Sequence, residues 1–328
     1  MDSLYLSHLV SQLLCGFIEA ILTTMADLKQ YLKWVAIILI WWVALPVVIS
    51  ALLSIVSAKE LLLGLMFIMR RKKKPVVVRT PEDRFLGLEK IGYTFKSNYV
   101  ELPIGGGKTM PRVHYIDEGP RDAKETIVCL HGEHSWSFLY RSMVPGLVKA
   151  GYRVIALDFI GFGKSDKFTY ADMYNHELYK MTLRLLLDHL KVQNVTLVCH
   201  DCGGPVGLSV VKEMPEIFSR LVIMNTFLPI GLYKAGAVKW SQLIPLSTRS
   251  PVAWDMQTTR DFLAAKWKRP ALIMFSDKDY FTRGHEKLFQ KLLPHASNKT
   301  VIGAGHYLQE DKGEELAMHI TSFIEGKL

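Results

Sequence analysis

A stretch of 25 residues without a charged side chain, residues 34–58, restricts the fold of this chain more than any other feature. As an α-helix the stretch is about 37 Å long at about 1.5 Å per residue, enough to cross a hydrocarbon core about 30 Å thick with some tilt. Buried helices of soluble proteins rarely stay uncharged for so long, and a cleaved signal peptide starts earlier and has a shorter apolar segment. We therefore expect an N-terminal membrane-anchor region, residues 1–74, with one transmembrane helix at about residues 34–58.

The charges on either side of this stretch predict its orientation. Lys29 and Lys33 precede it, whereas the consecutive basic residues 70–74 follow it. Because basic residues accumulate on the cytosolic side of a membrane span, we expect a single-pass protein with its C-terminal domain in the cytosol, in the endoplasmic reticulum membrane. The lack of a disulfide pattern among the four cysteines agrees with a cytosolic domain.

The net charge of +9 is one that nucleic-acid-binding proteins also carry. Much of the excess lies in residues 70–74, beside the apolar stretch, where a topology signal explains it better. No zinc-finger or RNP-like pattern accompanies it. We expect the lipid bilayer as a partner, and no nucleic acid.

The remainder of the chain reads as a linker, residues 75–89, followed by an α/β domain, residues 90–328. Short apolar runs predict buried strands at residues 127–130, 154–157, 195–199, 221–224 and 271–275. Apolar residues at helical spacing predict helices at residues 177–190 and 314–324. Residues 99–102 and 113–116 are expected to pair as a hairpin around the glycines 105–107. Such alternation is typical of a mainly parallel sheet with helices on both faces.

The strongest chemical signal follows the apolar run 195–199, where the chain continues His200-Asp201-Cys202-Gly203. A strand that ends in small-x-Asp-x-Gly before a helix has the pattern of a nucleophile elbow, a strained turn that exposes one side chain above the sheet. The elbow needs small neighbours because backbones crowd there. An aspartate that only caps the following helix is the simpler alternative.

Other segments support the elbow by their place and order. His131-Gly132-Glu133 directly follows the strand 127–130, where this fold builds half of an oxyanion hole. Asp279 lies just beyond the strand 271–275, and His306 follows a glycine-containing turn near the C-terminus. The order nucleophile, acid, histidine is the one that the α/β-hydrolase fold requires.

These segments resemble haloalkane dehalogenases and the related epoxide hydrolases. Residues 131–166 are most similar to the dehalogenases, and residues 197–207, 221–229 and 305–310 extend the resemblance over most of residues 90–328. The resemblance implies an α/β-hydrolase fold in which Asp201 is a covalent nucleophile and His306 is the base that activates water. Asp279 would be the acid that orients His306, with Asp277 as a second candidate. No cofactor or metal ion is expected.

An aspartate nucleophile changes the class of substrate. A carboxylate has an ordinary pKa of about 3.9 and is ionised without help, so it can displace a leaving group from a saturated carbon. The product is an ester, which water can cleave, whereas a serine would form a stable ether. The expected substrates are therefore small apolar molecules with a carbon–halogen bond or an epoxide. By the same resemblance, the backbone N–H groups of Glu133 and Cys202 form the oxyanion hole.

The chain also departs from its relatives. Dehalogenases normally carry a halide-binding tryptophan directly after the nucleophile, where this chain has Cys202, a weak donor; Trp136 is a candidate to contact the leaving group instead. Epoxide hydrolases usually have a proline where this chain has His134, and their two lid tyrosines are represented here by Tyr233 alone. The lid region, residues 230–266, is shorter than in either family, and a short helical lid admits water to the site.

Three functions remain in order of preference. The first is hydrolysis of carbon–halogen bonds by a haloalkane dehalogenase-like enzyme. The second is a membrane-bound epoxide hydrolase, and the third is a hydrolase-fold protein with a truncated lid and little activity.

Overall fold

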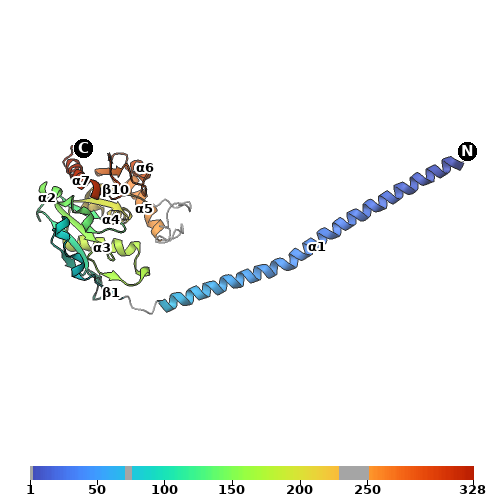
Figure 1. The fold of residues 1–328 in the computed structure, drawn as a ribbon, viewed down its shortest axis with the longest axis horizontal. Helices are drawn as coiled ribbons and strands as arrows, with labels where there is room; N and C mark the ends of the chain where they lie inside the picture. The colour runs from blue at the N-terminus through green and yellow to red at the C-terminus, as the bar shows by residue number, and fades with distance from the viewer. Residues whose placement is uncertain (1–2, 71–75, 229–250) are drawn as a thin grey trace. The chain divides into compact units, whose positions relative to one another are not determined.

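The computed structural model describes residues 3–70, 76–228 and 251–328, and the chain divides into two compact units, Met1–Lys74 and Pro75–Leu328. In the first unit a single helix, α1, runs from Ser3 to Arg70 (Figure 1). Within it, Gly16–Ala51 is long and apolar enough to cross a membrane, by length and composition alone; a signal sequence near an N-terminus meets the same criterion. Residues 71–74 of the basic run lie outside the described residues.

The second unit is built on a mixed, mainly parallel sheet whose strand order is β12-β11-β10-β9-β6-β7-β5-β2. The bounds of these strands along the chain are β2 Asn98–Val100, β5 Val113–Glu118, β6 Thr126–Leu130, β7 Arg153–Asp158, β9 Val195–Asp201, β10 Phe218–Thr226, β11 Ala271–Ser276 and β12 Ser297–Val301. Along the sheet, every pair of neighbouring strands between β12 and β7 is parallel, whereas β5 runs antiparallel to both β7 and β2. The expected strands and the mainly parallel sheet are confirmed.

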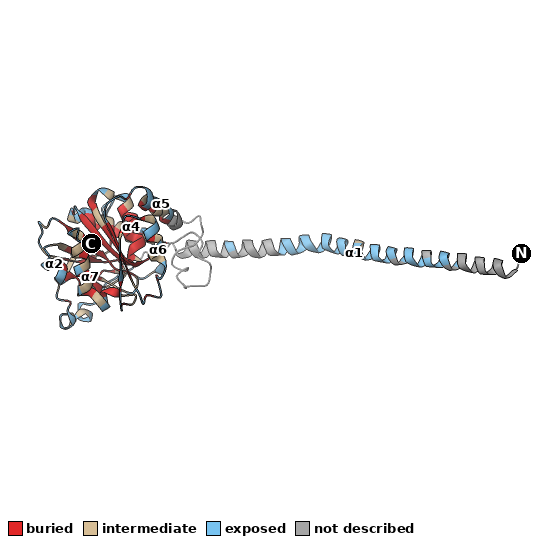
Figure 2. Ribbon diagram, turned by 90° about the horizontal axis from the view of Figure 1, so that it is seen from above, coloured by how far each residue is buried: buried red, intermediate tan, exposed pale blue. Residues whose placement is uncertain are grey.

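Helices cover both faces of this sheet because consecutive strand residues point to opposite faces and both sets are apolar. In β6, Val128 and Leu130 join one hydrophobic core, and Ile127 and Cys129 join the other. The first core contains residues of α3 (His176–Leu190), α4 (Gly203–Glu213), α5 (Pro251–Ala265) and α6 (His285–Leu292), and the second contains residues of α2 (Val144–Lys149) and α7 (Leu308–Ile324). Figure 2 shows the buried sheet between these two sets of helices.

Short elements complete the unit. They are the strand pair β1 (Val77–Val78) and β8 (Lys167–Phe168), the hairpin β3 (Pro103–Gly105) and β4 (Lys108–Thr109), and the 3-10 helices η1 (Glu82–Phe85), η2 (Leu88–Ile91), η3 (Ser137–Tyr140), η4 (Ala171–Met173) and η5 (Pro215–Ile217). The glycine turn expected between two longer strands is thus the tip of its own small hairpin, while β2 pairs with β5 beyond it.

Two segments differ from the expected organisation. Of residues 75–89, expected as a linker, residues 76–89 contain β1 and η1, and Arg79 donates two hydrogen bonds to Asp166, so this segment packs on the rest of the second unit. The second part of the expected lid forms α5, whose Met256 and Leu263 are buried in the core. The helix layer therefore includes residues 251–265, and residues 230–250 of the lid, with Tyr233, lie outside the described residues.

Candidate active site

Asp201 lies at the turn between β9 and α4, at the carboxyl edge of the parallel strands. Its φ of +49° is in the left-handed region, which a residue with a side chain enters only when its surroundings impose it. The turn is crowded: a Cβ on Gly203 would lie 2.6 Å from the carbonyl oxygen of Leu130, and one on Gly204 would overlap the side chain of Thr226. These contacts are the physical reason for the glycines that follow the aspartate, and they form the strained turn that the sequence predicted.

The carboxylate of Asp201 is 4% exposed and is held by backbone donors. The N–H of Glu133 donates to Oδ1 at 2.9 Å, and the N–H of Cys202 donates to the same carboxylate. Burial raises the pKa of Asp201, but the hydrogen bond with His306 and those from the two backbone N–H groups lower it below its ordinary value. Asp201 is therefore ionised at neutral pH and is oriented by the two N–H groups expected to form an oxyanion hole.

His306 lies between two carboxylates, in the loop between β12 and α7. Its Nε2 is 3.4 Å from Oδ2 of Asp201, and its Nδ1 is 3.1 Å from Oδ1 of Asp279. Burial lowers the pKa of His306, but the hydrogen bonds and charges of both carboxylates outweigh it and raise the pKa to about 9. In the resting protein at neutral pH the imidazole is therefore charged.

The structure distinguishes the two acids that the sequence left open. Asp279 is 1% exposed and accepts hydrogen bonds from the backbone N–H groups of Phe281 (2.8 Å) and Thr282 (3.2 Å) as well as contacting His306. Asp277 instead accepts a hydrogen bond from the backbone N–H of Gly303 at 2.7 Å. The loop after β11 thus brings Asp279, and not Asp277, to the histidine.

Two buried residues that sequence reasoning did not single out hold the loop of His306. His200 Nε2 lies 2.9 Å from the carbonyl oxygen of His306, and burial lowers the pKa of His200 to about 4, so it donates as a neutral ring. The side-chain amide of Asn225 donates to the carbonyl oxygens of His306 (3.0 Å) and Gly305 (3.1 Å). Asn225 is the last residue but one of β10 and has a φ of +34°, which favours asparagine, but only its partners reveal its role.

Three other residues considered in the sequence analysis, Trp136, Cys202 and His134, are also placed by the structure. The ring of Trp136 stacks on Phe138 and packs against Phe85 and Tyr93, so its described ring contacts are with other aromatic side chains. Cys202 is the N-cap residue directly before α4, and burial raises the pKa of its thiol well above the ordinary value. His134 has a φ of +56°, which a proline cannot adopt, and this explains the departure from the proline usual at that position.

Within residues 3–70, 76–228 and 251–328, no group of three or more His, Cys, Asp and Glu side chains is placed to hold a metal ion.

Comparisons with known proteins agree with this arrangement. The family model for the alpha/beta hydrolase fold matches residues 125–260. A haloalkane dehalogenase of Psychrobacter cryohalolentis is 33% identical over 301 residues, which cover 76% of this chain and 98% of that protein. A haloalkane dehalogenase of Mycobacterium marinum is 33% identical over 299 residues, covering 75% of this chain and 99% of the relative.

Among solved structures, the haloalkane dehalogenase DpaA of Paraglaciecola agarilytica is 29% identical, with a TM-score of 0.68 over 74% of this chain and 97% of that one. The similarity therefore extends over nearly the full length of each relative. The chain is a hydrolase with the α/β-hydrolase fold, and it belongs to the haloalkane dehalogenase family.

Proposed function

We propose that this protein hydrolyses carbon–halogen bonds of small apolar haloalkanes through an ester formed on Asp201. The observation that carries the proposal is the chain of contacts from Asp201 through His306 to Asp279, at 3.4 Å and 3.1 Å, on a strained elbow. Dehalogenase relatives favour this reaction over the hydrolysis of epoxides.

In the first step, an oxygen of Asp201 forms a bond to the carbon of the substrate while the carbon–halogen bond breaks, and the halide leaves with the electron pair. Oδ1 is held by the N–H of Glu133, which leaves Oδ2 as the attacking atom. Asp201 needs no general base, since its lowered pKa keeps it ionised at neutral pH.

Formation of the ester removes the charge of Asp201, so His306 loses its proton to solvent. In the second step, neutral Nε2 of His306 takes a proton from water, and the hydroxide adds to Cγ of the ester. The negative charge develops on Oδ1, which accepts the hydrogen bond from the N–H of Glu133, and the N–H of Cys202 also donates to this carboxyl group. Collapse of this intermediate breaks the bond from Cγ to Oδ2, and the alcohol leaves with the proton from His306. The carboxylic acid left on Asp201 then gives its proton to His306, which restores the resting state. Asp279 holds Nδ1 and stabilises the charged ring.

The test is a covalent trap. His306→Ala removes the base and should slow the second step by about 10²–10⁴-fold, so incubation with 1-bromobutane should leave a butyl ester on Asp201 that mass spectrometry of the peptide detects. Asp201→Ala is the matched control, which should show neither the ester nor bromide release. Turnover by Asp201→Ala would refute the assignment of the nucleophile, and diol formation from epoxides without halide release would move the assignment to an epoxide hydrolase.

We also propose that α1 anchors this enzyme in the lipid bilayer, as a single-pass protein of the endoplasmic reticulum with the hydrolase domain in the cytosol. The proposal is supported by the uncharged residues 34–58, the apolar helix Gly16–Ala51 and the basic residues 70–74. Apolar haloalkanes partition into lipid, so anchoring would place the enzyme where its substrates concentrate.

A further inference from the structure

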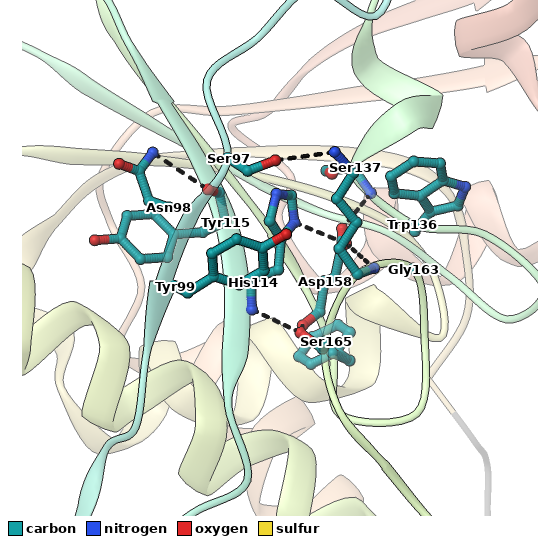
Figure 3. A network of polar contacts seen from close by, with 12 residues as sticks. Ser97, Asn98, Tyr99, His114, Tyr115, Trp136, Ser137, Asp158, Gly163 and Ser165 are labelled. Carbon is teal, nitrogen blue, oxygen red and sulfur yellow. Dashed lines mark hydrogen bonds and ion pairs between the residues drawn. The ribbon is translucent and has the colours of Figure 1, made fainter. Parts of the chain in front are cut away.

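The loop that carries the N–H of Glu133 is attached at one end to Asp158, the last residue of β7 (Figure 3). The Asp158 carboxylate has no exposed surface and reaches three separate segments. Its Oδ1 accepts a hydrogen bond from the backbone N–H of Ser137 at 2.8 Å, and its Oδ2 accepts from the backbone N–H of Lys164 at 2.8 Å. Nδ1 of His114 lies 2.8 Å from Oδ2 and also donates, since an ionised carboxylate only accepts.

The next residue of the chain attaches the other end of the same loop. The backbone N–H of Phe159 donates to Nε2 of His131 at 3.0 Å. Residues 131–137 are therefore tied at both ends to two consecutive residues at the carboxyl end of β7. Glu133, whose N–H donates to Oδ1 of Asp201 at 2.9 Å, lies between the two attachments.

The loop between these attachments is strained. His134, directly after Glu133, has a φ of +56°, and a left-handed residue other than glycine costs about 1–2 kcal/mol. Such backbone persists only where the surrounding structure over-determines it. Without its attachments the loop would relax, and the N–H of Glu133 would turn away from Asp201.

A buried ionised carboxylate is itself expensive unless every lone pair finds a donor. Burial raises the pKa of Asp158, but His114, His131 and the N–H of Ser137 outweigh burial and lower it, so the group stays charged. A charged acceptor makes a stronger hydrogen bond than a neutral one. The charged carboxylate of Asp158 therefore holds the strained loop more firmly than a neutral side chain would.

We propose that Asp158 is a positioning residue: together with Phe159 it clamps residues 131–137 so that the N–H of Glu133 faces Oδ1 of Asp201. The inference rests on the proposed function, and it implies that the clamp affects the two steps of the reaction differently. Alkylation takes charge away from the Asp201 carboxylate, whereas the addition of hydroxide to the ester places charge on Oδ1. Only interactions that strengthen in a transition state accelerate a step. The clamp therefore accelerates hydrolysis of the ester and not the alkylation of Asp201.

The experiment compares the two rates in Asp158→Asn and in the wild-type protein, using the full chain in detergent micelles and 1-bromobutane. Rapid-quench measurement of bromide gives the alkylation rate, and mass spectrometry gives the fraction of butylated Asp201. Removal of one oxyanion donor slows a reaction about 10²–10³-fold. For a displaced donor we expect at least about tenfold slower ester hydrolysis, a bromide burst at nearly the wild-type rate, and accumulation of the ester.

Asp117→Asn is the matched control. Asp117 is a buried carboxylate of the neighbouring strand β5, held by two hydrogen bonds from Arg153 at 2.9 Å and 2.8 Å, and these bonds do not involve the loop 131–137. If a residue has only a structural role, its replacement lowers the amount of active protein, so the bromide burst and the turnover fall together. We expect this result for Asp117→Asn. An unchanged ratio of the two rates in Asp158→Asn overturns the proposal.

If circular dichroism shows that Asp158→Asn does not fold, His131→Ala tests the other attachment. It removes the acceptor of the Phe159 N–H and should shift the ratio of the two rates in the same direction, and an unchanged ratio there again overturns the clamp. If the wild type releases no bromide and His306→Ala forms no ester, the proposed function itself is refuted, which is a different result from an unchanged ratio.

Discussion

Replacing Asp201 with asparagine should release the proton of His306 before any substrate is present. The change removes the charge 3.4 Å from Nε2 of His306 and leaves Asp279 in contact with Nδ1 at 3.1 Å. Formation of the ester removes the same charge, so the variant reproduces the electrostatics of the intermediate. The quantity of interest is the pKa of His306, about 9 in the resting protein.

The structure sets the size of this effect. The difference between an ordinary pKa of about 6.5 and about 9 corresponds to roughly 3 kcal/mol, at about 1.4 kcal/mol per pKa unit. Two unit charges 3.4 Å apart interact by about 5 kcal/mol at an effective dielectric constant of about 20. That figure is an upper limit, because 11% of the His306 side chain reaches solvent. Since Asp279 remains, we expect the pKa to fall by about one to three units, to roughly 6–8.

The assay is a carbon-13 NMR titration of histidine-labelled protein in detergent micelles, with the His306 resonance assigned from His306→Gln. Asp277→Asn is the control, since Asp277 bonds to the backbone of Gly303 and not to the imidazole. A pKa of His306 that stays near 9 in Asp201→Asn would refute the reasoning, because the elevation would then owe nothing to the nucleophile. A fall in both variants would show that distant charge, and not this contact, sets the value.

The remaining predictions concern pH, the histidine loop, the leaving group and topology. Because the second step needs neutral His306 and the first needs only ionised Asp201, acid should slow ester hydrolysis before alkylation, and the butyl ester should accumulate below about pH 6, measured by mass spectrometry; equal slowing of both steps would contradict this. Asn225→Ala leaves the N–H of Ser276 without its partner and removes one of two donors from each of the carbonyl oxygens of Gly305 and His306, and should lower the free energy of unfolding by about 1–3 kcal/mol in urea titrations. Halide electrodes should find bromoalkanes turned over faster than chloroalkanes, and Cys202→Trp should raise chloride release, unless brisk chloride release by the wild type shows that no donor is missing. Protease added to sealed microsomes should digest residues 75–328, and full protection would reverse the proposed orientation.

The sequence by itself determined the fold and the elbow, because both depend on local patterns. Buried parallel strands need continuous apolar runs, and residues 127–130 and 195–199 carry them. The crowded turn at Asp201 needs the glycines at positions 203 and 204 for steric reasons that hold in any chain with this turn. Chain order then distinguished His306 from an ordinary surface histidine.

Only the tertiary structure decided which side chains converge. Asp277 and Asp279 are two residues apart in the same loop, and the turn of that loop alone sends one to Gly303 and the other to His306. Asn225 gains its partners from the loop after β12, 80 and 81 residues further along the chain. His114 and Asp158 are 44 residues apart and meet because β5 and β7 pair in a register that sets them opposite each other. Strand register and loop conformation are non-local, so propensity and spacing do not encode them, whereas the hydrogen bonds that they permit determine how the nucleophile is held.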